Sequence, residues 1–142
     1  MHACALCSPA DEELLWHDDF CRVIWVDDPH YPGFCRVILH THVREMSDLA
    51  AADQTRLMQV VFSVESAVRA TLQPDKINLA SLGNVVPHVH WHVIPRWMED
   101  VNFPDAIWAP PRRADAAPGP LASANAEAIR SALRQQLAAR LG

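Results

Sequence analysis

Three histidines at alternate positions are the feature of this chain most suggestive of chemistry. His88, His90 and His92 lie in the run His88–Pro95, whose other residues are apolar and include no glycine. Such a run predicts a β-strand that projects all three imidazoles from one face, with neighbours about 6–7 Å apart. The residues expected to point the other way, into a core, are Val89, Trp91 and Val93. Neutral imidazole is a metal ligand as well as a nucleophile or acid–base group, so two kinds of site remain open.

A second group with chemical potential lies near the start of the chain. Cys4 and Cys7 have the C-x-x-C spacing that can place two thiolates on one metal ion. Residues 1–13 contain no apolar run of signal-peptide length, so we expect a cytoplasmic protein whose cysteines are thiols or metal ligands. A pair of thiols that binds no metal is the alternative.

The elements that must position these groups follow from hydrophobic periodicity and turn residues. Five strands are predicted, at 14–16, 20–26, 35–40, 76–82 and 86–96. Apolar residues at three- and four-residue spacing predict a helix over 48–72 that packs on the sheet. A proline-rich stretch over 109–120 precedes a second helix predicted at 121–141. This order predicts an α+β fold.

Composition restricts the partners. The chain of 142 residues has a net charge of −5, and its single lysine is Lys76. Nucleic-acid binding depends on many phosphate contacts from lysine and arginine, so we expect no nucleic-acid partner. No stretch reaches the ~20 apolar residues of a membrane span, so we expect no membrane partner either.

Two segments together resemble a known family. The run Gly83–Arg96 resembles the histidine triad (HIT) signature, His-φ-His-φ-His-φ-φ with φ apolar, and Asp27–Val43 resembles the family's upstream loop, strand and x-His-φ segment. The resemblance covers residues 4–98 and implies a five-stranded antiparallel sheet packed by one long helix. It implies a HIT domain, which we place at 1–108. Composition and periodicity predict that the Pro/Ala-rich linker and C-terminal helix of 109–142 pack on the domain or on a partner subunit.

The family resemblance also implies a mechanism. His90 would attack the α-phosphorus of a nucleotide and form a nucleotidyl-histidine, which water or another acceptor then resolves. His92 would hydrogen-bond near the transferring phosphate or set the tautomer of His90, and His88 completes the triad. The implied substrate-binding residues are Asn84 and Asn78 for the phosphate and Asp27 for the ribose hydroxyls. Local hydrogen bonding within turns is the alternative role for these polar residues.

A metal site is implied as well. Some family members, and the related galactose-1-phosphate uridylyltransferases, complete a C-x-x-C site with two histidines. Here that set is Cys4, Cys7, His42 and His88, which would hold a structural zinc ion. No organic cofactor is expected. A triad that serves only a structural zinc site is a further alternative.

The chain departs from the family pattern at one position that bears on chemistry. After Pro-Gly the family normally has a histidine, and here Phe34 takes its place. The expected function is that of a hydrolase or nucleotidyltransferase acting on dinucleoside polyphosphates or related adenylylated compounds. A purine nucleoside phosphoramidase and a nucleotide-binding module with little turnover are the alternatives. Family members usually dimerise, so we expect a homodimer, with aromatic residues at an interface or substrate rim: Trp97, Phe103 and Trp108.

Overall fold

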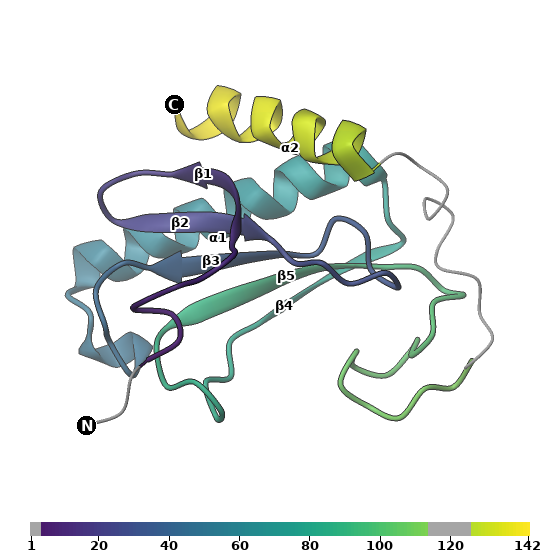
Figure 1. Ribbon diagram of the computed structural model, residues 1–142, viewed down its shortest axis with the longest axis horizontal. Coiled ribbons are helices and arrows are strands. Elements are labelled where there is room, and N and C mark those ends of the chain that lie inside the picture. Colours follow the sequence, from purple (N-terminus) through teal and green to yellow (C-terminus); the bar gives the residue numbers. More distant parts are fainter. Residues whose placement is uncertain (1–3, 114–125) are drawn as a thin grey trace.

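The computed structural model describes residues 4–113 and 126–142 (Figure 1). The strands are β1 (Glu13–His17), β2 (Cys21–Trp25), β3 (Cys35–Leu39), β4 (Lys76–Ala80) and β5 (His90–Arg96). The helices are α1 (Ala51–Leu72) and α2 (Ala126–Leu141), and a short 3-10 turn spans Met46–Asp48. The predicted α+β fold is confirmed.

The five strands form one antiparallel sheet in the order β1-β2-β3-β5-β4. Helix α1 crosses one face of this sheet, and α2 packs on α1 and β1 of the same chain (Figure 1). The apolar stripe of α1 is buried against the sheet, as its periodicity predicted. Residues 114–125, which include part of the predicted linker and the start of the predicted second helix, lie outside the described residues, and the domain division after residue 108 stays a prediction.

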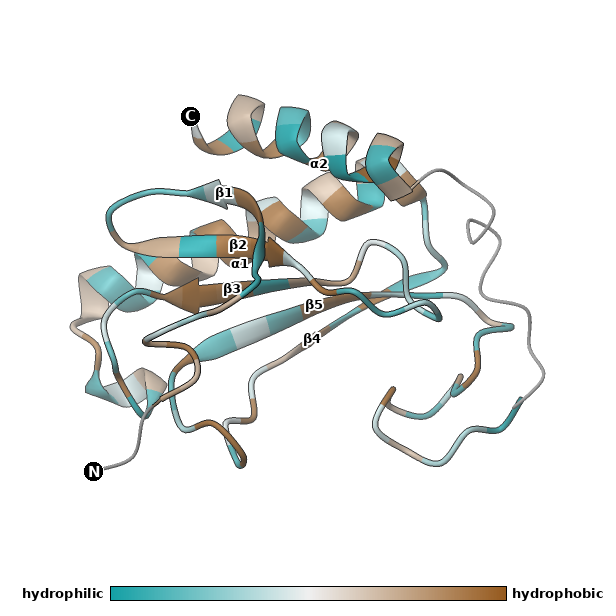
Figure 2. Ribbon diagram, viewed as in Figure 1, coloured by the Kyte–Doolittle hydropathy of each residue, from teal (hydrophilic) through white to brown (hydrophobic). Residues whose placement is uncertain are grey.

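The two faces of the sheet carry different residues. On the α1 side, buried side chains of the central strands form the core: Val23, Val37 and Val93. Residues directly opposite each other on antiparallel strands project from the same face. The register places Ile38 opposite His90 and Arg36 opposite His92, so the far face of β3 and β5 carries the histidines and an arginine. Figure 2 shows β2 and β3 brown over much of their length, whereas the first part of β5 is teal and white.

The histidine strand is shorter than predicted. Instead of beginning at residue 86, β5 begins at His90. Pro87 has no backbone N–H to donate to a ladder, and the amide of His88 instead donates to the Val86 carbonyl at 2.8 Å in a tight turn. His88 therefore lies in the bend before the strand, and only His90 and His92 are strand residues.

Other boundaries differ by a few residues. The predicted helix 48–72 begins at Ala51, after the 3-10 turn, and the predicted strand 76–82 ends at Ala80. Within the ranges 4–113 and 126–142, no helix is long and apolar enough to cross a membrane.

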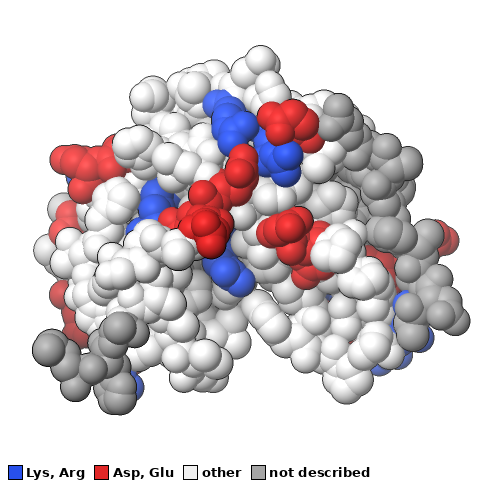
Figure 3. All heavy atoms as spheres, in the orientation of Figure 1, with Lys and Arg blue, Asp and Glu red and all other residues white. Residues whose placement is uncertain are grey.

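Charged side chains of opposite sign lie side by side on the face shown in Figure 3. Arg134 contacts Glu13 at 2.8 Å, and Arg130 contacts Glu127 at 2.8 Å, which ties α2 to β1 and to itself. On this face the positive groups are thus paired rather than gathered into a broad basic patch.

Candidate functional site

The candidate site is centred on His90 and His92, which project from the face of the sheet opposite α1. Their rings lie 5.0 Å apart with an interplanar angle of 78°. The residues between and beside them, Val89, Trp91 and Val93, pack in or against the core, as period-two alternation predicted. The strand therefore separates a packing face from a face on which two imidazoles lie side by side.

A hydrogen bond fixes the tautomer of His90. Its Nδ1 donates to the backbone carbonyl of His88 at 2.6 Å. Because a carbonyl oxygen only accepts, the proton of the neutral ring must lie on Nδ1, and Nε2 keeps its lone pair. His90 is half-buried, so this nitrogen belongs to a ring that a ligand can approach. A neutral ring held in this way has a nitrogen lone pair that can act as a nucleophile.

His92 is held in the opposite tautomer. The guanidinium Nε of Arg36 donates to His92 Nδ1 at 3.4 Å, which leaves the ring proton on Nε2. Burial, together with the nearby charges of Arg36 and His90, lowers the pKa of His92 to about 4. His92 is therefore neutral near pH 7 and can donate a hydrogen bond from Nε2 without carrying a charge.

Aromatic rings border His92 on two sides. The Phe34 ring lies 5.8 Å from the His92 ring, and the Trp108 ring lies 5.1 Å from it. Phe34 is buried, whereas Trp108 is 52% exposed. The prediction that Trp97 lies at an interface or substrate rim is wrong, because Trp97 is buried in the core. Trp108 contacts the histidine site directly.

Trp108 belongs to loop 97–113, which a buried ion pair anchors to the end of β5. Arg96 Nε contacts Asp100 Oδ2 at 2.8 Å, and Asp100 also accepts the backbone amides of Trp97, Asn102 and Phe103. Burial alone would raise the pKa of Asp100, but the hydrogen bonds from Arg96 and the backbone outweigh it and hold that pKa below its ordinary value. The loop that carries Trp108 thus starts from a rigid corner.

The predicted substrate-binding residues lie at different depths. Asn84 is exposed in the bend after Gly83, a residue whose φ of +80° suits glycine. The Asn78 carbonyl oxygen accepts from Arg96 Nη1 at 2.7 Å, which leaves its amide nitrogen as the group able to donate. Asp27 is exposed after β2, while Asp28 accepts the backbone amide of His30 at 2.9 Å within the turn. The substrate roles of Asn84, Asn78 and Asp27 stay predictions.

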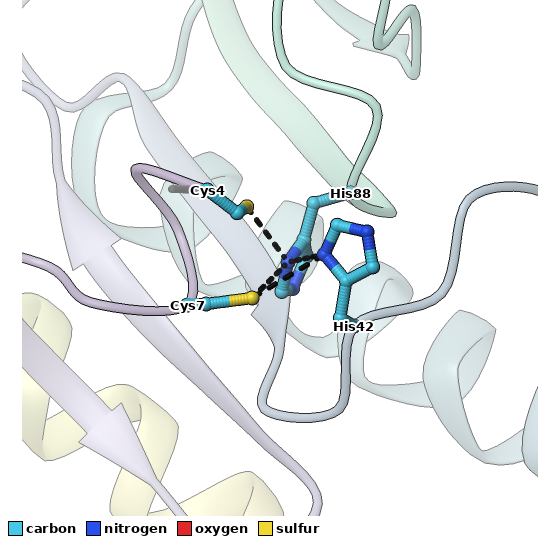
Figure 4. A group of neighbouring side chains, drawn as sticks. All are labelled: Cys4, Cys7, His42 and His88. Atoms are coloured by element: carbon cyan, nitrogen blue, oxygen red, sulfur yellow. Dashed lines mark hydrogen bonds between the residues drawn. The ribbon is translucent and has the colours of Figure 1, made fainter. Parts of the chain in front are cut away.

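The four predicted metal ligands converge at the other end of β5. Cys4 and Cys7 come from the N-terminal segment, His42 from the loop after β3, and His88 from the bend before β5 (Figure 4). Their ligand atoms all lie within 4.8 Å of one another, and the two histidine Nδ1 atoms are 3.2 Å apart. These residues could hold a metal ion.

The surroundings support such a role for the cluster. His88 Nε2 donates to the Leu39 carbonyl at 2.7 Å, so its Nδ1 presents a lone pair to the cluster. The turn between the cysteines is pinned from outside, because Arg22 donates to the Leu6 carbonyl at 2.8 Å and pairs with Glu12. His88 therefore contributes its ring to the cluster and its carbonyl to His90.

Sequence reasoning missed two functional elements of this site. The sequence analysis did not single out Arg36. It lies two residues after Phe34, and on an extended chain this spacing places the two side chains on the same face. The Arg96–Asp100 anchor was not foreseen, although an Arg and an Asp four residues apart follow the histidine run directly. Which strand lies beside β5 decides what Arg36 contacts, and that pairing is a tertiary property.

Comparisons with known proteins agree with this geometry. The HIT domain matches residues 8–98, a range that includes His42 and His88 and excludes Cys4 and Cys7. A histidine triad protein from Bradyrhizobium japonicum superposes with a TM-score of 0.74 at 27% identity, over 89% of this chain and 91% of that one. A histidine triad protein from Marinobacter aquaeolei gives a TM-score of 0.73 at 25% identity, over 91% and 90%.

Curated relatives carry names that describe activities. An "AP-4-A phosphorylase" of Mycobacterium tuberculosis is 28% identical over 81 residues, which are 53% of this chain and 42% of the relative. A "Bis(5'-nucleosyl)-tetraphosphatase [asymmetrical]" of Schizosaccharomyces pombe is 29% identical over 86 residues, 57% of this chain and 47% of the relative. The matched part is thus about half the length of these relatives.

Proposed function

Because this chain belongs to the HIT family, we propose that it is a nucleotide hydrolase or nucleotidyltransferase that cleaves at the α-phosphate through a nucleotidyl-histidine on His90. The observation that carries the proposal is the 2.6 Å hydrogen bond from His90 Nδ1 to the His88 carbonyl. It leaves Nε2 unprotonated and oriented by the backbone, which is what attack on phosphorus requires. Relatives named as an AP-4-A phosphorylase and a bis(5'-nucleosyl)-tetraphosphatase support the substrate class.

The residues divide the work as follows. The Nε2 lone pair of His90 forms a bond to the α-phosphorus, and the bond to the leaving group breaks with its electron pair. The hydrogen bond from His90 Nδ1 to the His88 carbonyl becomes stronger as the ring gains positive charge. His92 Nε2 donates to a phosphate oxygen, and Asn84 and the Asn78 amide add donors. Water then attacks phosphorus and releases one proton to solvent, while the P–N bond breaks and its electron pair returns to His90 Nε2.

We propose that Asp27 accepts hydrogen bonds from the ribose hydroxyls. Its neighbour Val26 donates its backbone amide to the Phe34 carbonyl at 2.9 Å and packs on the cluster that contains Phe34. The aromatic rings offer apolar surface to the nucleoside, since an exposed tryptophan can stack on a base. A dinucleoside polyphosphate is favoured over a phosphoramidate as the substrate. Cleavage of a phosphoramidate requires a proton for the departing amine, and neutral His92 does not readily give one up.

We also propose that Cys4, Cys7, His42 and His88 hold a structural zinc ion. Tetrahedral zinc with Zn–S of about 2.3 Å and Zn–N of about 2.0–2.1 Å needs ligand atoms about 3.3–3.8 Å apart. The Cys7 Sγ–His42 Nδ1 separation of 3.3 Å and the Cys4 Sγ–His88 Nδ1 separation of 3.4 Å fit this requirement. Zinc would fix the N-terminal segment and the carbonyl that orients His90; it would take no part in bond cleavage.

Turnover of diadenosine polyphosphates tests the proposed function. We expect the wild-type chain to release a nucleoside monophosphate, and His90→Asn to lose at least ~10³-fold in kcat, because removal of a nucleophile leaves only binding and orientation. His40→Ala, at an exposed histidine outside the site, is the matched control and should retain activity. A nucleotide-binding module would bind the monophosphate and release nothing. A homodimer in the cytoplasm stays our prediction, and sedimentation equilibrium tests the dimer.

A further inference from the structure

Arg36 is a positive charge that contacts no carboxylate among the described residues. Among the described arginines that are not fully exposed, Arg22, Arg96, Arg130 and Arg134 each contact a carboxylate, and Arg36 alone does not. The nearby carboxylate of Glu12 is committed to Arg22 at 2.7 and 3.0 Å. A partly buried guanidinium that lacks a counter-charge favours binding of an anion from solution.

The side chain of Arg36 is oriented from two directions. Its Nε donates to His92 Nδ1, and its guanidinium carbon lies 5.8 Å from the centre of the Phe34 ring. Its terminal nitrogens make no hydrogen bond to any residue in the described ranges. The buried side-chain nitrogen and oxygen atoms that lack a partner in those ranges are Thr71 Oγ1 and Arg130 Nε. The terminal nitrogens of Arg36 are not among them, so these nitrogens must be accessible to solvent. Two accessible guanidinium nitrogens next to His92 can donate hydrogen bonds to the oxygens of one phosphate.

The leaving group decides which chemistry such a charge can help. When the α-phosphate bond of a dinucleoside polyphosphate breaks, the electron pair stays on a phosphate oxygen, which is stable near pH 7 without taking a proton. When a phosphoramidate bond breaks, the pair stays on nitrogen, which must hold a proton to depart as an amine. A guanidinium stabilises the departing phosphate but cannot supply that proton, because it does not deprotonate in proteins.

We infer that Arg36 binds the departing phosphate and thereby selects leaving groups that depart as phosphate anions over those that depart as amines. The inference rests on the transfer through His90 proposed above, and it adds a residue and a leaving-group preference. Phe34 takes the position at which the family pattern has a further histidine. Its ring lies beside His92 and carries no charge, so the charge next to His92 is that of Arg36.

Steady-state kinetics on two substrates test the inference. For Arg36→Met we expect kcat/KM to fall ~100-fold with diadenosine tetraphosphate and less than ~5-fold with adenosine 5′-phosphoramidate, since one charge-assisted contact is worth about tenfold to 150-fold. Arg36→Lys should recover part of the loss, and Arg69→Met, which removes an exposed arginine of α1, should change neither value. Equal losses on both substrates, or no loss on either, would overturn the inference.

Equilibrium binding keeps this test separate from that of the proposed function. Calorimetry with AMP and ADP should show that the wild-type chain binds ADP more tightly and that Arg36→Met removes most of this preference. An unchanged ratio of affinities in Arg36→Met overturns the inference even if both substrates are turned over. Absence of any turnover by the wild-type chain would instead contradict the proposed function, and the affinity ratio would still decide the role of Arg36.

Discussion

The two ends of β5 are held by different chemistry. At its start, Cys4, Cys7, His42 and His88 come together from three separate segments, and Cys7 and His42 are exposed. At its end, Arg96 and Asp100 form a buried ion pair only four residues apart, with backbone amides completing the shell. One end assembles around a site that could hold a metal ion, whereas the other is complete within the chain itself.

The difference bears on the histidines between these ends. The start of β5 orients His90, since the His88 carbonyl accepts from its Nδ1. The end of β5 sets the rim, since Asp100 fixes the loop that brings Trp108 to His92. We therefore expect disruption of the first end to act on metal binding and on His90, and disruption of the second to act on stability and on substrate binding.

The largest expected effect comes from breaking the end held by the ion pair. Asp100→Ala leaves the Arg96 guanidinium buried without its partner, and loss of one member of a buried pair costs about 3–5 kcal/mol. Urea denaturation should show this loss in the free energy of unfolding. Asp105→Ala is the matched control, because its carboxylate pairs with the exposed Arg112 and should be worth at most about 1 kcal/mol. Equal losses for both variants would mean that burial of the Asp100 pair is not what stabilises the loop.

The end with the cysteines should depend on metal. His42→Ala removes a ligand, so the purified variant should carry far less than one zinc ion per chain. With free zinc at about 100 times its Kd, the wild-type chain should gain about 2.7 kcal/mol that the variant lacks. His40→Ala, two residues earlier in the same segment, should bind zinc as the wild-type chain does. Metal analysis and thermal unfolding with and without chelator check this, and a wild-type chain without zinc would refute the zinc proposal.

Acid should separate the middle of the strand from its anchored end. The pKa of His92 is about 4 in the folded chain and 6.5 ordinarily, so between these values the unfolded chain binds more protons and stability falls as pH falls. We expect about 1–2 kcal/mol between pH 6.5 and pH 4, allowing for partial solvent access. Because its pKa is lowered, Asp100 should keep its contribution over this window and lose it only at lower pH.

Unfolding free energies measured against pH in a chelator test this, with His92→Phe as the comparison. The variant cannot titrate at position 92, so its stability should fall less steeply over the same window. A slope equal to that of the wild-type chain would show that His92 titrates alike in the folded and unfolded states.

The smallest effect should come from the rim. Trp108→Ala leaves both anchors intact, so stability should change by less than about 0.5 kcal/mol for this half-exposed side chain. If the ring contacts the nucleoside, KM for a dinucleoside polyphosphate should rise several-fold while kcat changes little. A fall in kcat at constant KM would assign Trp108 to the orientation of His92 instead.

Much of this arrangement is local in origin and was predictable from sequence. Alternation of imidazoles with Val89, Trp91 and Val93 predicted the two faces of the strand, and three- and four-residue spacing predicted α1. The convergence of Cys4 and Cys7 on His42 and His88 came from the family resemblance rather than from spacing, because their sequence separations carry no distance information.

Features that depend on strand pairing and loop packing could not be predicted in the same way. The contact between Arg36 and His92 needs the register of β3 on β5, and the bond from Arg96 to Asn78 needs that of β4. Pro87 shortened the histidine strand through a turn that the apolar pattern concealed. Trp97 follows the strand directly and is buried in the core, although the sequence analysis predicted it at an interface or substrate rim.

Mass spectrometry of the chain after rapid mixing with diadenosine tetraphosphate tests the central claim most directly. We expect a transient mass increase of one adenylyl group, located by peptide mapping on His90, absent from His90→Asn and present in Trp108→Ala. An adduct that persists in His90→Asn, or turnover by the wild-type chain without any adduct at the earliest times, would contradict it.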